Sequence, residues 1–125
     1  MGYTAFPKSS KMMIKIIRGR LSAAELKSFL GRPYSNMVKF VVDLEKEILA
    51  LGGELHADSE ALLLEEGSAQ ENLWGGNYYP ANSPEEKIQY TSFINIRPAL
   101  GNKSMEITDE KRRARMKAVV EKLLS

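Results

Sequence analysis

The chain of 125 residues contains no cysteine. This absence excludes disulfide bonds, thiolate zinc sites and cysteine nucleophiles, and it fits a reducing compartment. Long apolar runs are missing too, because Lys15 and Arg18 interrupt the apolar stretch near the N-terminus. We therefore expect neither a membrane span nor the apolar core of a signal peptide, and we expect a cytoplasmic protein.

Neither sign of charge dominates, because 18 Lys and Arg residues face 16 Asp and Glu residues and the formal net charge is +2. This small excess gives no reason to expect a nucleic-acid partner or an anionic membrane surface. The one basic cluster, at 111–117, opens the last predicted helix, and such a run usually forms a solvated helix face.

Histidine is almost absent, and the single residue, His56, lies among carboxylates at every second position: Glu54, Asp58 and Glu60. Alternate side chains of a strand share one face, so these groups are predicted to point the same way. An imidazole beside carboxylates can bind a metal or move a proton near neutral pH. Glu54, His56 and Asp58 are therefore candidate catalytic residues and weak candidate metal ligands.

A structural role for this cluster is the interpretation that we favour. The chain lacks a second histidine and the His-Glu-x-x-His pattern, so a zinc ion would need an otherwise all-carboxylate shell. A lone histidine in a small protein is more often structural. We therefore expect no metal and no cofactor.

The overall composition, 43% apolar and 27% charged, is typical of one globular domain. We expect a flexible leader at 1–11 and a single domain at 12–125. Residues 12–18 read as a strand, since they are apolar and partly β-branched. Ser22 and Glu25 form a capping-box pattern, which predicts a helix over 23–30 that ends at Gly31.

Two middle segments remain ambiguous. Residues 37–51 fit either one helix or a hairpin; the β-branched and aromatic content of 38–44 favours the hairpin, whereas 45–47 makes a poor tight turn. Residues 58–66 fit a short helix or a strand. One-turn helical starts are expected at 68–71 and 83–86.

The C-terminal third is predicted to contain the best strand, at 88–97, with Ile94 and Ile96 facing the core and Phe93 as an exception to the alternation. Residues 105–107 would return as a partner strand. The last helix would run from 108 or 109 to about 124. The expected fold is one compact α+β domain with a mixed or antiparallel sheet, a short N-terminal helix and a C-terminal helix.

Five further side chains are candidates for ligand binding. Arg97 and Asn95 fall on the polar face of the predicted strand, where a guanidinium suits a carboxylate or phosphate. A structural pair of Arg97 with Glu106 or Glu54 is the more common outcome. Trp74 and Tyr78 lie in a Gly-rich stretch and could wall a pocket, although such aromatics more often cover a small core. The ligand-binding candidates are Arg97, Asn95, Glu106, Trp74 and Tyr78.

Three blocks, in order, resemble a small uncharacterised prokaryotic family, a domain of unknown function. The resemblance covers the chain from Met12 to its C-terminus and implies a stand-alone domain of prokaryotic type, with no activity, ligand or catalytic residue attached. The blocks are Gly-Gly-Glu-Leu-His-Ala-Asp at 52–58, Leu-Trp-Gly-Gly-Asn-Tyr-Tyr-Pro at 73–80, and Ile-Asn-Ile-Arg-Pro at 94–98 followed by Gly-Asn-Lys-Ser-Met-Glu-Ile at 101–107.

Two functional hypotheses follow from these side chains. The first is a non-catalytic binding or regulatory protein that takes a protein or a small anionic ligand, and it is the one we favour. The alternative is an enzyme for small-ligand or metal-assisted chemistry at Glu54, His56 and Asp58, with Arg97 as an anion clamp. A convergent pocket holding both His56 and Arg97 would favour the enzyme, and a flat apolar patch with dispersed polar residues would favour the binding protein.

Overall fold

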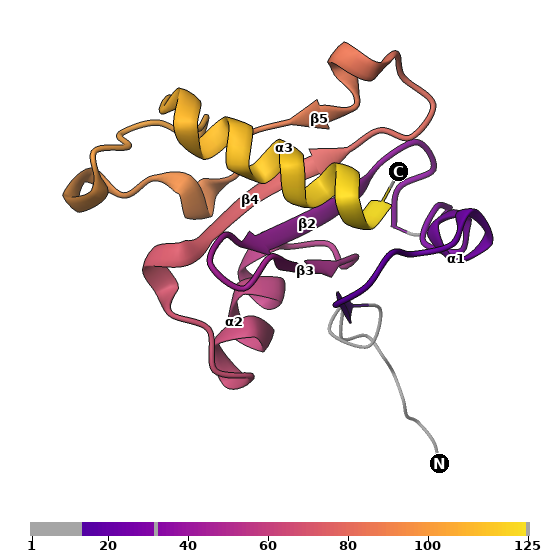
Figure 1. Ribbon diagram of the computed structural model, residues 1–125, viewed down its shortest axis with the longest axis horizontal. Coiled ribbons are helices and arrows are strands. Elements are labelled where there is room, and N and C mark those ends of the chain that lie inside the picture. The colour runs from indigo at the N-terminus through magenta and orange to yellow at the C-terminus, as the bar shows by residue number, and fades with distance from the viewer. Residues whose placement is uncertain (1–13, 32, 125) are drawn as a thin grey trace.

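A five-stranded antiparallel sheet in the order β1-β3-β2-β4-β5 organises the chain in the computed structural model, which describes residues 14–31 and 33–124 (Figure 1). The α+β fold with a C-terminal helix agrees with the prediction from sequence. The expected leader at 1–11 lies outside the described residues. The strands are β1 (Lys15–Ile17), β2 (Val38–Asp43), β3 (Ile48–Leu51), β4 (Leu73–Tyr78) and β5 (Ile88–Gln89).

Helices cover both faces of this sheet. The long helix α3 (Glu110–Leu124) lies across β2 and β4 and closes the larger core, into which Phe40 and Trp74 point (Figure 1). The helix α2 (His56–Glu65) packs on β2 and β3 at the opposite face, where Leu63 meets Val41. β2 is covered on both faces, and its centre is accordingly an apolar run, Phe40 to Val42.

The segment 37–51 forms the predicted hairpin, with Val41 opposite Ala50. Its turn contains no glycine and is stabilised by a side chain instead. The Asp43 carboxylate accepts the backbone N–H groups of Glu45 and Lys46, both at 2.9 Å. Glu47 then adopts φ 57°, a left-handed conformation that is uncommon for residues other than glycine.

The first helix begins where its capping-box sequence predicts. Ser22 Oγ accepts the Glu25 N–H at 3.1 Å, and the Glu25 carboxylate accepts the Ser22 N–H at 3.1 Å, which is the predicted capping box. The helix α1 (Ala23–Lys27) is shorter than predicted, and a turn leads on to Gly31 at φ 100°.

The strand predicted at 88–97 is wrong beyond Gln89. Short 3₁₀ turns occupy Phe93–Asn95 and Pro98–Leu100, and residues 105–107 make only an isolated bridge, between Thr91 and Glu106. Ile96 is 43% exposed and lies outside the core. At this position the backbone of β4 bonds to a side chain and not to a neighbouring strand.

The strand geometry assumed for 54–60 is wrong as well, because α2 begins at His56 and runs to Glu65. The helical alternative for 58–66 is the one that forms. The predicted apolar stripe of α3 is confirmed, since Met116, Val119, Val120 and Leu123 are all buried. Within the described residues, every helix is too short or too polar to cross a membrane.

Candidate functional site

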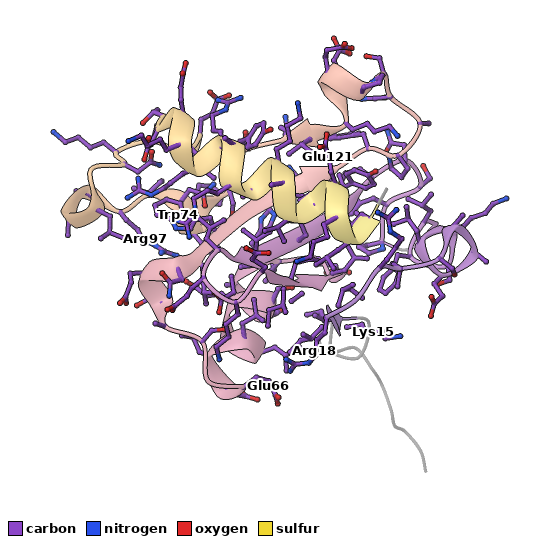
Figure 2. The ribbon with its side chains drawn as sticks, viewed as in Figure 1. Lys15, Arg18, Glu66, Trp74, Arg97 and Glu121 are labelled. Carbon is purple, nitrogen blue, oxygen red and sulfur yellow. The ribbon has the colours of Figure 1, made fainter. Side chains whose placement is uncertain are left out.

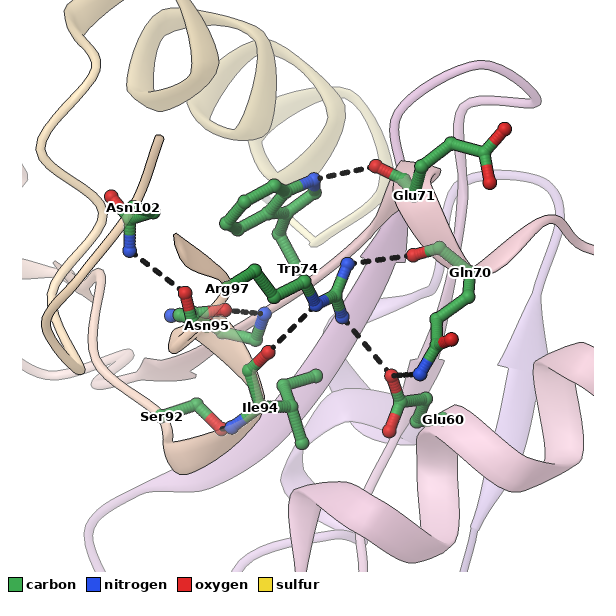
Figure 3. A network of polar contacts seen from close by, with 10 residues as sticks. Glu60, Gln70, Glu71, Trp74, Ser92, Ile94, Asn95, Arg97 and Asn102 are labelled. Carbon is green, nitrogen blue, oxygen red and sulfur yellow. Dashed lines mark hydrogen bonds and ion pairs between the residues drawn. The ribbon is translucent and has the colours of Figure 1, made fainter. Parts of the chain in front are cut away.

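Asn95, which is completely buried, fixes an irregular segment against the edge of β4 (Figure 3). Its Oδ1 accepts the Gly75 N–H at 2.8 Å, and its Nδ2 donates to the Gly75 carbonyl at 3.0 Å. These are the two bonds that a neighbouring strand residue would make with Gly75. The amide thus replaces the strand that the alternation of 88–97 suggested.

Asn102, also completely buried, holds the same segment from the other side. Its Nδ2 lies 2.8 Å from the Asn95 carbonyl oxygen and 2.9 Å from that of Glu106. Its Oδ1 accepts from both the backbone N–H and the hydroxyl of Thr108, each at 3.0 Å. The buried polar groups of this segment are thus satisfied by side chains and not by a strand ladder.

Arg97 extends from this fixed segment towards α2. Its Nη2 lies 3.0 Å from the Glu60 carboxylate, its Nε donates to the Ile94 carbonyl at 3.0 Å, and its Nη1 donates to the Gln70 carbonyl at 2.7 Å (Figure 3). The side chains of Arg97 and Glu60 are only 12% and 14% exposed. Burial lowers the pKa of Arg97, and the Glu60 carboxylate opposes that shift.

The ion pair bears directly on the predicted roles of Arg97. The partner of Arg97 is Glu60, and neither Glu106 nor Glu54 as the sequence suggested. Three of its five N–H groups donate within the molecule and the side chain is only 12% exposed, so the guanidinium is not presented as an open anion clamp.

Trp74 lies beneath the ion pair at the start of β4. Figure 2 shows it beside Arg97, whose guanidinium carbon is 4.9 Å from the indole centroid; that of Arg112 on α3 is 4.4 Å away. The indole N–H donates to the Glu71 carbonyl at 3.1 Å. Trp74 is 1% exposed, so its surface is covered by these contacts and by the core.

The basic run of α3 is less solvated than predicted. Arg112 donates to the Leu100 carbonyl in addition to its contact with Trp74. Arg113 lies 4.2 Å from the Tyr90 ring centroid, and Arg115 donates to the Leu44 carbonyl. These three arginines help to attach α3 to the sheet and to the irregular segment.

A surface groove of about 520 Å³ lies beside Arg97, and we call it the Arg97 groove. Its wall presents Phe93, which is 77% exposed, and Ile96, which is 43% exposed. Both are large apolar side chains on the segment held by Asn95 and Asn102. The lining consists of Glu60, Gln70, Glu71, Phe93, Ile94, Ile96, Arg97, Pro98, Ala99 and Leu100.

His56 occupies a buried position at the start of α2. Its Nε2 lies 2.8 Å from the Gly76 carbonyl oxygen, to which the ring donates. Burial lowers the pKa of His56 from 6.5 to about 4, the Gly76 bond opposes that shift, and the Lys39 ammonium adds to it. The ring is therefore neutral and already committed to a structural hydrogen bond near pH 7.

The candidates proposed from sequence are only partly gathered. Asn95, Arg97 and Trp74 meet at the start of β4, whereas Tyr78 is buried in the larger core and Glu106 lies by Arg113 in another hollow. Within 14–31 and 33–124, no three His, Asp or Glu side chains are grouped so as to hold a metal. Glu54 and Asp58 accordingly form no such cluster with His56.

Sequence reasoning missed Phe93, Ile96, Gln70 and Glu71 as groove residues. Phe93 was the one apolar residue on the polar face of the predicted strand, and that exception was the available signal. The sequence pattern places Glu60 only on a predicted strand with His56. On a helix these two residues lie about one turn apart, which lets Glu60 reach Arg97 while His56 is buried.

No curated protein and no solved structure matched this chain. The family DUF5674, described as a protein of unknown function, matches residues 15–123, and the chain therefore belongs to that family.

Proposed function

We propose that this protein is a non-catalytic binding protein whose partner docks in the Arg97 groove. The observation that carries the proposal is the exposure of Phe93 at 77% and Ile96 at 43% on a rigidly held segment. Aromatic side chains such as Phe are enriched in the buried centres of protein interfaces, where a few residues carry most of the binding energy.

The hydrogen bonds of Asn95 and Asn102 support this role. A loop fixed before binding loses less conformational entropy when a partner docks, so more of the contact energy appears as affinity. The two asparagines bond the segment to Gly75 and to Thr108, on either side of the groove wall. The apolar groups are thus presented on a preformed surface.

The sequence blocks that resemble the family acquire structural meaning under this proposal. The block at 94–107 contains both asparagines, and the block at 73–80 contains Gly75, which Asn95 contacts. We propose that these two blocks mark this fixed segment, in a cytoplasmic domain of prokaryotic type. The cysteine-free sequence and the resemblance support that placement.

A display experiment tests the proposal. Peptides from a random library would be selected on the wild-type protein, and their affinities measured for two variants by fluorescence anisotropy. Phe93→Ala is expected to weaken binding about fivefold or more, since truncating an interface anchor costs more than about 1 kcal/mol. Leu55→Ala is the matched control, because Leu55 is 60% exposed and lies outside the groove.

Equal affinity for both variants would contradict the proposal. Circular dichroism and urea titration would establish that both variants keep the wild-type fold, as expected for exposed side chains. A library that yields no peptide above background would count against the groove as a recognition site.

A further inference from the structure

We infer that the Arg97 groove selects a protein segment carrying both apolar side chains and a lysine or arginine, with Glu71 as the residue that pairs with this cation. The inference rests on the proposed function and names its partner class. It follows from the charges in the groove lining and from which of them are already neutralised.

Arg97 and Glu60 neutralise each other within the lining. Their closest N–O distance is 3.0 Å, and Gln70 Nε2 lies 3.4 Å from the same Glu60 oxygen. Both charged side chains are less than one-sixth exposed. A ligand that sought either charge would have to break a paired, largely desolvated contact, which is costly.

Glu71 is the third charged residue of the lining. Its backbone carbonyl is fixed by the Trp74 N–H, and its side chain extends away from the ion pair (Figure 3). No side chain in the described part of the chain pairs with its carboxylate, and the residue is exposed. The lining therefore carries a net charge of −1 with one carboxylate open to a partner.

The other lining residues favour a peptide ligand over a small anion. An anion would meet Glu71, while Arg97 is largely buried and already paired with Glu60. The groove also presents Phe93, Ile96 and Leu100, which match apolar side chains. Charge complementarity and apolar contact together favour a segment that is both basic and apolar.

Peptides selected on the wild-type protein provide the test. We expect Lys or Arg to be enriched beside Leu, Phe or Trp. We also expect Glu71→Gln to weaken binding about two- to fivefold, the range for an exposed ion pair, and Glu71→Lys to weaken it further. Glu65→Gln is the matched control, since Glu65 is an exposed glutamate outside the groove. Affinity should fall as ionic strength rises from about 50 to 300 mM.

The outcomes separate this inference from the proposed function. Peptides that lose affinity with Phe93→Ala but are acidic, or are indifferent to Glu71→Gln, would overturn the inference and leave the binding role intact. Peptides indifferent to Phe93→Ala would overturn both. If light scattering shows self-association that Phe93→Ala abolishes, the partner is a second copy of this chain, and the inference of a basic segment fails.

Discussion

His56 connects folding stability to pH through a single side chain. The folded protein holds the ring neutral, with a pKa of about 4, whereas the unfolded chain titrates near the ordinary value of 6.5. Between these values the unfolded state binds more protons, so stability is complete above about pH 6.5 and falls as the pH drops towards 4. The difference amounts to about 3 kcal/mol.

Urea titrations of the wild type and of His56→Gln between pH 4 and pH 7 measure this dependence. The glutamine amide can still donate to the Gly76 carbonyl but does not titrate. We expect the wild type to lose stability relative to the variant as the pH falls through this window. Parallel pH profiles would show that the ring is not buried in its neutral form. Because the chain has one histidine, its imidazole NMR signals report the pKa directly.

At the scale of the element, β4 depends on glycines that let its neighbours approach closely. A Cβ built at Gly76 would lie 2.6 Å from Phe40 Cζ and 2.9 Å from the Gln89 carbonyl oxygen. The Phe40 ring is completely buried, and the carbonyl belongs to the backbone of β5, so neither can move away easily.

Gly76→Ala is therefore expected to destabilise the fold by about 1–3 kcal/mol, the usual cost of overpacking a core. Gly19→Ala is the control, because a Cβ there meets nothing within 4 Å and the backbone is not left-handed. It should be neutral or slightly stabilising. Denaturation midpoints of the two variants measure the difference; a similar shift in both would mean that β4 adjusts without strain.

Elements with local signals were predictable from sequence, and elements set by tertiary contacts were not. The capping box of Ser22 and the stripe around Val120 are read within one helix, so sequence alone locates them. The alternating sequence at 88–97 is also a good strand pattern. In the structure, however, the Asn95 side chain bonds to Gly75 in place of a backbone partner. Nothing local in the sequence shows that an amide will do this.

In the candidate site, likewise, residue chemistry was predictable from sequence and tertiary partners were not. Asn95, Arg97 and Trp74 were selected for their chemistry, and they do meet. Their partner Glu60 comes from a segment whose helix was only one of two alternatives. Both a strand and a helix place His56 and Glu60 on one face, but on α2 His56 bonds to Gly76 and Glu60 pairs with Arg97, and the sequence does not show these tertiary partners.

At the scale of the whole molecule, Asn102 joins the groove segment to the start of α3. Asn102→Asp replaces the Nδ2 donor with a second oxygen that faces the carbonyls of Asn95, Ser104 and Glu106 in a fully buried site. We expect a loss of roughly 3–5 kcal/mol at pH 7, comparable to leaving a buried charge unpaired. Asn36→Asp, at an exposed asparagine, should change stability by less than about 0.5 kcal/mol.

The sign of the pH dependence checks this explanation. Burial beside carbonyl oxygens would raise the pKa of the new carboxyl group, so the variant should regain stability at low pH and lose it as the pH rises. Urea midpoints at pH 4 and pH 7 for both variants provide the comparison. A penalty that does not depend on pH would show that the loss arises from packing and not from the buried charge.

Trp74 provides an intrinsic fluorescent probe. It is the only tryptophan of the chain, it is buried within 5 Å of two guanidinium groups, and its N–H is bonded to the carbonyl of Glu71. Indole emission responds to hydration and to nearby charge, so one fluorophore reports both global unfolding and any movement of Glu71 against Arg97. Since Arg97 and Glu71 line the groove, we expect a partner that enters it to change this emission, which would allow a titration without a label.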